Sequence, residues 1–358
     1  MENIQIKSGQ SNYGVYFVSN LSGLIKQIQD ISNSVVVIDT KVAELYQELF
    51  QSLDRNNTIV KIDATEDEKS LKGVTNLLTF MQKQGVRKQG TVIAIGGGII
   101  EDIAAFAAHV YFRGLRWFYI PTTLLSMCDS CIGAKVGINF NNYKNQLGFF
   151  CPPEKVLIHI DFLKTLSESD VESGYGEILK LSLVGPEPFW DEFVESVTSK
   201  DLERTLIKGL IKKSLLAKKY YIEIDEYDLG IRRILNYGHS FGHALEVVTG
   251  YLVPHGQAVV WGIDLANWLS LELGLLKENV FTQIHDLISE CFKFKLQKKI
   301  LAEDLLQIVR HDKKVSGEMI NMILLKDIGV HDIIPVKIDK KLQVMINKYL
   351  SQIAFTKA

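Results

Sequence analysis

The sequence predicts an α/β fold of two domains, an N-terminal Rossmann-like α/β domain with a parallel sheet and a C-terminal domain that is mostly α-helical. In the first half, short β-branched runs alternate with helix-like segments, a pattern typical of a parallel sheet covered by helices. From about Leu166, long segments of helical periodicity take over. The length suits about two domains, which we expect at residues 1–165 and 166–358. Because no linker rich in Pro, Gly or Ser separates them, we expect the active site in the cleft between them.

The same patterns predict the individual elements in chain order. The alternating amino terminus predicts an edge hairpin, and four apolar runs predict the strands after it: SVVVIDT (34–40), TVIAI (91–95), RWFYIP (116–121) and KVLIHID (155–161). Helices are expected over 167–183, 201–224, 239–248, 258–275 and 278–291. One short strand-like run, MINMILL (319–325), interrupts the helical half.

Charge and hydropathy exclude several classes of protein. The 358 residues carry 40 Lys and Arg against 42 Asp and Glu, a net charge of −2, which argues against nucleic-acid binding and polybasic membrane binding. The amino terminus lacks the regions of a signal peptide. The longest apolar run, 258–276, contains Asp264, Asn267 and Glu272, so a buried helix is expected instead of a membrane span. These features predict a cytoplasmic protein.

Two of the four cysteines, Cys128 and Cys131, form a C-x-x-C motif. Such a motif could be redox-active or half of a zinc site. No second C-x-x-C exists to complete a zinc cluster, and cysteine is among the residues most often buried. We therefore expect reduced, packed thiols.

A glycine-rich turn follows the run TVIAI, and VIAIGGGIIED reads as strand, three glycines and helix. Glycine lets the backbone approach a phosphate closely, and a helix amino terminus offers unpaired N–H groups, so the turn favours a nucleotide pyrophosphate. The motif is not G-x-G-x-x-G, however, and the acid suited to a ribose, Asp39, lies upstream instead of downstream. A tight turn without a ligand is the alternative interpretation.

The stretch NYGHSFGHALE holds His239 and His243, four residues apart. On a helix they share one face, where they could bind a metal or serve as hydrogen-bonded core residues. A third histidine, His255, is expected in a loop feeding the next helix, and Glu177 lies in the helical segment GYGEILK. Catalytic zinc commonly takes three ligands such as two histidines and a glutamate and keeps one position open. This set could hold zinc and leave one histidine spare.

Basic residues accompany these candidate ligands. Lys180 lies three residues after Glu177 in an otherwise apolar segment, where a buried cation without an anionic partner is costly. Arg232 lies seven residues before His239, about two helical turns if the helix extends back that far. The remaining candidate cations are Lys135, Lys144, Lys218, Lys313 and Lys314.

Together these motifs resemble the 3-dehydroquinate synthase family of NAD- and zinc-dependent sugar-phosphate cyclases. The similarity runs nearly end to end and rests on GGGIIEDIAAFAA, YFRGLRWFYIPTTLLSMCDSCIGAKVGIN, YKNQLGFFCPPEKVLIHIDFLKTL, GEILK and RRILNYGHSFGHALE. The resemblance implies a lyase that cyclises 3-deoxy-D-arabino-heptulosonate 7-phosphate (DAHP) to 3-dehydroquinate with release of phosphate, in the shikimate pathway of aromatic amino acid biosynthesis. It implies NAD and Zn²⁺, or Co²⁺ in its place, as cofactors, and a small sugar phosphate as substrate.

The resemblance also implies roles for residues at matching positions. Its metal ligands are Glu177, His239 and His255. Residues placed at the reacting part of the substrate are Asp129, Lys135, Lys180, Asn236 and His243. The phosphate and carboxylate would be held by Lys144, Asn145, Lys218, Arg232, Lys313 and Lys314. Arg113 matches an arginine that reaches substrate across a dimer interface, so a homodimer is implied. The NAD-binding positions are Asp39, Glu66, Lys69, Gly97, Gly98, Asp102, Thr122, Thr123, Phe162 and Thr165.

Departures from the family's pattern concern the substrate. Glu101 replaces the usual Gly before the loop aspartate, DSSVGGK has become DSCIGAK with Ala134, and HGEAV has become HGQAV with Gln257. YKNQLG and GEILK look closer to relatives that cyclise sedoheptulose 7-phosphate. The alternatives are therefore a sister cyclase for another sugar phosphate, a metal-dependent polyol dehydrogenase that consumes NAD, and a non-catalytic binding protein.

Overall fold

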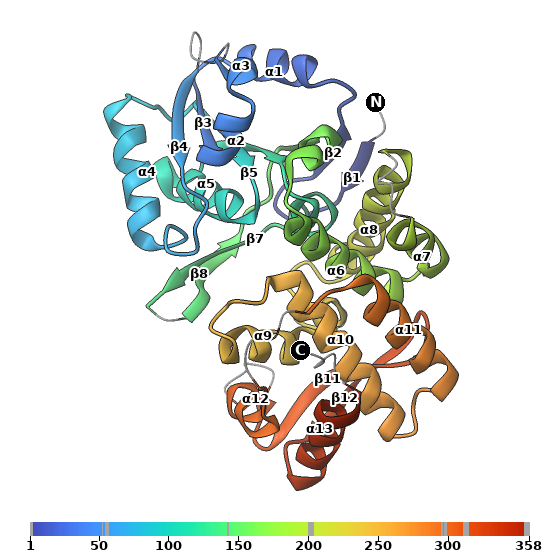
Figure 1. Ribbon diagram of the computed structural model, residues 1–358. Helices are drawn as coiled ribbons and strands as arrows, with labels where there is room; N and C mark the ends of the chain where they lie inside the picture. Colours follow the sequence, from blue (N-terminus) through green and yellow to red (C-terminus); the bar gives the residue numbers. More distant parts are fainter. Residues whose placement is uncertain are drawn as a thin grey trace. The chain divides into compact units, whose positions relative to one another are not determined.

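The chain divides into two compact units, Met1–Ser167 and Glu168–Ala358. The structure is a computed structural model that describes residues 3–51, 53, 57–141, 143–199, 204–294, 296, 299–310 and 315–353. The first unit is an α/β layer structure around a mainly parallel sheet, and the second is mostly helical (Figure 1). The predicted fold class is confirmed.

A seven-stranded sheet in the order β1-β2-β9-β6-β5-β3-β4 forms the core of the first unit. Its strands are β1 Asn3–Ile6, β2 Tyr13–Phe17, β3 Ser34–Asp39, β4 Thr58–Ile62, β5 Thr91–Gly96, β6 Arg116–Pro121 and β9 Lys155–Ile158. Only β1 and β2 pair antiparallel, as the expected edge hairpin, and every other neighbouring pair is parallel. The central strands β3, β5 and β6 are buried along nearly their whole length, because helices cover both faces of a parallel sheet.

The helices of the first unit connect these strands (Figure 1). They are α1 Leu21–Gln29, α2 Thr40–Leu45, α3 Gln47–Phe50, α4 Leu71–Lys83 and α5 Gly98–Val110, with the short helical turns η2 Tyr111–Arg113, η3 Ser126–Ser130 and η4 Ile160–Thr165. Asn20 and Ser70 begin α1 and α4, since their side chains accept hydrogen bonds from backbone N–H groups of the first turn, a common helix cap. A separate hairpin, β7 Lys135–Phe140 with β8 Tyr143–Phe150, packs β7 against α4 and α5.

Helix α10, His255–Glu272, is the centre of the second unit, and residues 256–270 are all buried. The apolar run thus forms the expected buried helix. It packs against α6 Glu168–Val184, α9 His239–Val248, α11 Glu278–Cys291, α13 Lys340–Gln352 and the strand β11 Met319–Asp327 (Figure 1).

The remaining elements of the second unit surround this bundle. They are α7 Trp190–Thr198, α8 Arg204–Ile224, η5 Ile231–Asn236, α12 Ala302–Val309, β10 Val315–Ser316 and β12 Val330–Lys337. The antiparallel sheet β10-β11-β12 contains the expected strand MINMILL. Its partner β12 is mostly exposed, so its apolar residues give no buried run that the sequence could reveal. Over the residues described, no helix combines the length and apolar character needed to cross a membrane.

Candidate metal and substrate site

Helices α6 and α10 touch through their backbones where two glycines meet. A Cβ on Gly256 would lie 1.8 Å from the carbonyl oxygen of Ser173, and one on Gly176 would lie 2.3 Å from the carbonyl oxygen of Gly256. The Gly256 N–H also donates to Ser173 Oγ at 2.9 Å, and the Gln257 amide donates to the carboxylate of Glu172. This contact brings the middle of α6 beside the first turn of α10.

Helix α9 approaches α10 by the same means. A Cβ on Gly262 would lie 2.0 Å from the Gly238 carbonyl oxygen, and one on Gly242 would lie 2.8 Å from the Ala258 carbonyl oxygen. Gly238 has φ +77°, a conformation that glycine adopts without strain. The glycines of NYGHSFGH therefore let the histidines of α9 stand next to the start of α10.

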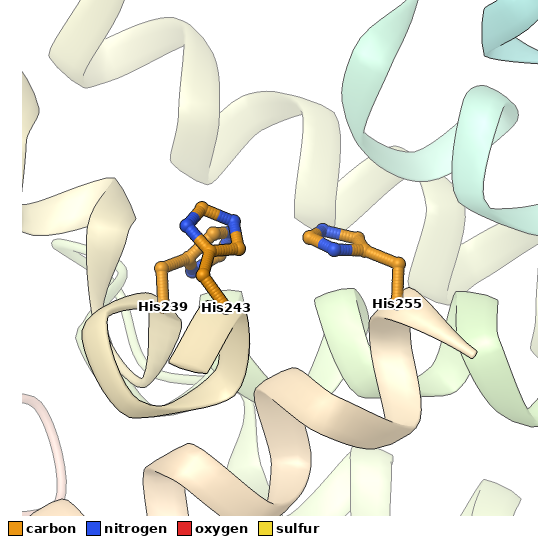
Figure 2. A group of neighbouring side chains, drawn as sticks. All are labelled: His239, His243 and His255. Atoms are coloured by element: carbon orange, nitrogen blue, oxygen red, sulfur yellow. The ribbon is translucent and has the colours of Figure 1, made fainter. Parts of the chain in front are cut away.

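Three histidines converge at this crossing (Figure 2). His239 and His243 rise from one face of α9, and His255, the first residue of α10, faces them. His255 thus begins a helix instead of lying in the expected loop. The ring centroids are 5.3–5.7 Å apart, and the three rings can offer nitrogen atoms within 4.8 Å of one another.

Glu177 of α6 adds a carboxylate to this group. Its Oε1 atom lies 3.2 Å from Nε2 of His255 and 3.6 Å from Nε2 of His239. Two ligands of a tetrahedral zinc ion with bonds of about 2.0–2.1 Å lie roughly 3.3 Å apart. The two distances from Glu177 to the histidines are therefore close to those between ligands of one ion, and the exposed His243 offers a nitrogen within 4.8 Å of those of His239 and His255.

The other ring nitrogens of two of these histidines are held by acceptors. His239 Nδ1 donates to the backbone carbonyl of Tyr237 at 3.1 Å, and His255 Nδ1 faces Glu246 Oε2 at 3.5 Å. The Nε2 atoms consequently point toward Glu177. The sequence interpretation missed Glu246, although its position seven residues after His239 places it on the same face of α9.

Glu177 and Lys180 form the buried part of this group, and the charge of Glu177 interacts with the neighbouring histidines. Glu177 and Lys180 are 1% and 2% exposed and form an ion pair. Burial alone would raise the pKa of Glu177, but Lys180 and the nearby histidines hold it well below its usual range. Burial holds the pKa of His239 well below its ordinary value. Burial also disfavours the charged form of His255, yet its hydrogen bonds to two carboxylates raise its pKa to about 9.

The cations expected at the substrate carboxylate are buried elsewhere in the second unit. Lys218 on α8 is 7% exposed and Arg232 in η5 is 2% exposed, and these two elements pack together. The condition that one helix extends back from His239 to Arg232 is not met, because η5 ends at Asn236 and α9 begins only after the left-handed Gly238. Arg232 Nη1 donates to the Glu226 carbonyl.

The remaining candidates of the second unit divide into two groups. The Asn236 side chain, at the end of η5, donates to the Arg233 carbonyl at 3.1 Å. Lys313 and Lys314 lie outside the described residues.

In the first unit, the expected nucleotide residues gather where parallel strands end. Gly97 is the N-cap of α5, and Asp39 is the last residue of β3 and caps α2 by accepting from the Lys41 N–H at 2.9 Å. A Cβ on Gly97 would lie 3.1 Å from Thr123 Cγ2. Because β3, β5 and β6 are neighbours in the sheet, their carboxyl ends form one edge, the usual ligand-binding edge of such sheets. The residues at this edge are Asp39, Gly97, Gly98, Thr122 and Thr123.

Other expected residues of the first unit form a polar network beside the β7–β8 hairpin. Lys69 pairs with Asp102 at 2.6 Å, and Asp102 accepts from the Gly137 N–H at 2.8 Å. Lys144 lies 4.0 Å from Glu66. Asn145 has φ +53° and donates through its backbone to Asn139. Phe162 and Thr165 lie apart from this network on η4, where both contact Tyr46.

The loop DSCIGAK carries Asp129 in η3 and Lys135, exposed, at the start of β7. Ala134 has φ +59°, a conformation that favours the glycine usual in the family. Cys128 and Cys131 are buried and form no disulfide, in agreement with the expectation of packed thiols.

Arg113 is exposed in a turn where φ is positive at Phe112, Arg113 and Gly114. Lys88 Nζ donates to the carbonyls of Phe112 and Gly114, at 2.7 and 2.8 Å. This turn therefore holds Arg113 out toward solvent.

Family comparisons agree with the motif pattern over most of the chain. Residues 59–173 match the family described as 3-dehydroquinate synthase N-terminal, and residues 174–315 match 3-dehydroquinate synthase C-terminal. The 3-dehydroquinate synthase of Dictyoglomus turgidum is 36% identical over 340 residues, which are 93% of this chain and 94% of that protein. That of Thermoanaerobacter pseudethanolicus is 34% identical over 360 residues, 96% and 100% of the two chains.

Solved structures share the fold. The 2-epi-5-epi-valiolone synthase ValA from Streptomyces hygroscopicus subsp. jinggangensis, with NAD⁺ and Zn²⁺ bound, has a TM-score of 0.87 at 25% identity, covering 97% of this chain and 98% of that one. A 2-deoxy-scyllo-inosose synthase with carbaglucose-6-phosphate, NAD⁺ and Co²⁺ has a TM-score of 0.84 at 22% identity, covering 99% and 100%. The expected cofactors, NAD with Zn²⁺ or Co²⁺, are those of these related structures.

Proposed function

Because the chain belongs to the 3-dehydroquinate synthase family, whose enzymes are lyases acting on a phosphorylated sugar, we propose that it converts DAHP to 3-dehydroquinate and phosphate. The observation that carries the proposal is the convergence of Glu177, His239 and His255 on one point. A buried carboxylate and two histidines, which bind a metal in their neutral form, are a donor set suited to a catalytic zinc ion.

We assign Zn²⁺, or Co²⁺ in its place, to these three residues and NAD to the first unit. Bound zinc would acidify a substrate hydroxyl, and NAD⁺ would accept a hydride from the carbon that bears this hydroxyl and later return it. Glu177 contributes the negative charge, and its pairing with Lys180 keeps it ionised in a buried position. His243 is exposed beside the ligands, where it is suited to hold a proton for the substrate. Asp129, Lys135 and Asn236 are assigned to the other substrate hydroxyls.

NAD is assigned to the edge where β3, β5 and β6 end. The N–H groups that begin α5 at Gly97 and Gly98 suit a pyrophosphate, and Asp39 suits a ribose. The further residues assigned to NAD are Glu66, Lys69, Asp102, Thr122, Thr123, Phe162 and Thr165. Lys144 and Asn145 are assigned to the substrate phosphate, together with Lys313 and Lys314.

The choice of DAHP depends on its carboxylate. Arginine matches a carboxylate with two parallel hydrogen bonds, and lysine adds a point charge. Arg232 and Lys218 are both buried and belong to elements that pack together. We assign the substrate carboxylate to this pair.

We also propose that the enzyme is a cytoplasmic homodimer. The support for a homodimer is Arg113, which is exposed on a left-handed turn. Lys88 stabilises this turn by donating hydrogen bonds to two of its carbonyls. Strained turns of this kind persist where the protein needs a side chain in one position. In a homodimer, Arg113 would bind the substrate held by the partner subunit.

The test compares wild type with Arg232→Ala and Arg233→Ala on DAHP. Arg233 is exposed and adjacent in sequence, so its loss changes the net charge equally without removing the buried guanidinium. Arg232→Ala should cost about 3–5 kcal/mol for breaking a buried ion pair, a loss in kcat/KM of about a hundredfold or more. Arg233→Ala should stay near wild type, and both variants should keep zinc and NAD⁺ binding. Equal activity of the two variants would contradict the assignment of Arg232.

A sister cyclase is the second candidate, favoured by the similarity to the valiolone synthase structure and by Ala134 and Gln257. It would act on a sugar phosphate without a carboxylate, such as sedoheptulose 7-phosphate. Wild-type phosphate release from that substrate alone would overturn the choice of DAHP and leave the cyclase assignment intact.

A further inference from the structure

Glu246 is a buried carboxylate that the assignments above do not use. It is 6% exposed and lies on α9, the helix that also carries two of the converging histidines. His239, His243 and Glu246 occupy positions i, i+4 and i+7, which share one face of a helix. A buried carboxylate is costly unless it has a polar partner.

One partner of Glu246 is His255, across the α9–α10 crossing. The Glu246 Oε2 atom lies 3.5 Å from His255 Nδ1, and on the other side of the ring Glu177 Oε1 lies 3.2 Å from Nε2. The imidazole therefore stands between two carboxylates. If Nδ1 carries the proton toward Glu246, the Nε2 lone pair is free to bind a metal beside Glu177.

His239 is held in the equivalent way by a different acceptor. Its Nδ1 donates to the Tyr237 carbonyl at 3.1 Å, which leaves Nε2 on the side of Glu177. Such partners fix the tautomer and ring orientation of a metal-binding histidine and increase its basicity. For His239 the partner is backbone and survives any substitution, but for His255 it is a side chain.

We propose that Glu246 is a positioning residue that orients His255 for the metal, and this rests on the proposed zinc site. Its role is to hold the Nδ1 proton and to add negative charge behind the ring. Loss of such a partner typically weakens metal binding about 10–100-fold.

The experiment measures zinc affinity by competition with a chromophoric chelator, and the visible absorption spectrum of the Co²⁺-substituted protein. Variants are Glu246→Gln, which keeps an acceptor oxygen but loses the charge, and Glu246→Leu, which loses both. We expect Glu246→Leu to bind zinc about 10–100-fold more weakly with a changed Co²⁺ spectrum, and Glu246→Gln to fall between it and wild type. If Glu246→Leu does not fold, Glu246→Gln alone decides by the same two measurements.

Asp264→Asn is the matched control, because Asp264 is a fully buried carboxylate bonded at 3.0 Å to Nδ1 of His285 in the same unit. It should lose thermal stability while retaining wild-type zinc affinity and Co²⁺ spectrum. A folded Glu246 variant with wild-type zinc affinity and spectrum would overturn the inference. Failure of the proposed zinc site is distinguishable, because His255→Ala would then also bind zinc like wild type.

Discussion

Glu177 is the residue that links the charged groups of the candidate metal site. It contacts His239, His255 and Lys180 while being 1% exposed. An isolated buried carboxylate is strongly disfavoured, so these contacts are what allow it to stay ionised. A bound divalent cation would add a further positive charge to the three groups that already stabilise this carboxylate.

The histidines should differ in what they contribute. We predict that His239→Ala and His255→Ala each weaken zinc affinity because each removes a direct ligand. The loss should exceed the roughly 10–100-fold that is typical when a residue bonded to a ligand is removed. His243→Ala should retain about one zinc per chain while losing turnover, since His243 is placed beside the substrate. Metal analysis of purified protein, together with an activity assay, checks both. Full metal content in His255→Ala would show that the ligand set is misassigned.

Ala134 lies where the family usually has glycine, with φ +59°. We predict that Ala134→Gly changes the free energy of unfolding by less than about 1 kcal/mol, since relief of the left-handed conformation offsets the added freedom of the unfolded chain. Ala134→Val should destabilise by about 1–3 kcal/mol, because a β-branched residue is strained at positive φ. Denaturant unfolding of both variants measures this. Equal stabilities would contradict the description of this turn.

At the scale of single residues, the sequence identified the candidate site residues better than it predicted their arrangement in space. The four candidate groups Glu177, His239, His243 and His255 stand together. The seven-residue spacing of Arg232 from His239 corresponds to two helical turns only if one helix spans both, and Gly238 at φ +77° interrupts it. Periodicity carries no information on such a break, since glycine is also tolerated inside helices.

The contacts between elements depend on glycines that sequence patterns do not explain. Gly256 and Gly262 sit where backbone oxygens of α6 and of the turn before α9 would overlap with any Cβ. The sequence around a glycine inside an apolar helix does not indicate which other helix packs against that glycine. The α6–α10 and α9–α10 crossings, which assemble the candidate metal site, were therefore beyond prediction, although α9 and α11 themselves begin and end where the periodicity predicts.

A second buried cluster joins α10, α11 and α13. His285 Nδ1 lies 3.0 Å from both carboxylate oxygens of Asp264, and the Tyr349 hydroxyl donates to Asp264 at 2.8 Å. Burial works against the charged form of His285, but the hydrogen bond and charge of Asp264 raise its pKa above the ordinary value. A raised pKa in the folded state means that protonation favours folding.

We predict that the stabilisation from His285 is fully present below about pH 6.5, the ordinary histidine pKa, and is lost as pH rises through the higher folded-state pKa. His285→Gln should lower the free energy of unfolding by about 1.5–3 kcal/mol at pH 6, and by less at pH 9. Denaturant unfolding of both proteins at the two pH values measures the difference. A deficit that grows with pH would contradict the assignment.

At the scale of the whole chain, alternation of strand and helix patterns was enough to predict the fold class. The runs at 34–40, 91–95 and 116–121 correspond to β3, β5 and β6, because buried parallel strands are apolar throughout. The order of the strands in the sheet, with β9 between β2 and β6, could not be read from the chain. It is decided by long-range packing instead of local propensity.

The most direct test of the central claim is whether NAD⁺ acts as a catalyst. Purified protein is incubated with Zn²⁺, DAHP and an amount of NAD⁺ far below that of DAHP. Phosphate, 3-dehydroquinate and NADH are measured in the same reaction. The proposed cyclase should release phosphate and 3-dehydroquinate in equal amounts, far exceeding the NAD⁺ supplied, with no net NADH. Accumulation of NADH in step with substrate loss, without release of phosphate, would contradict the cyclase and indicate a polyol dehydrogenase.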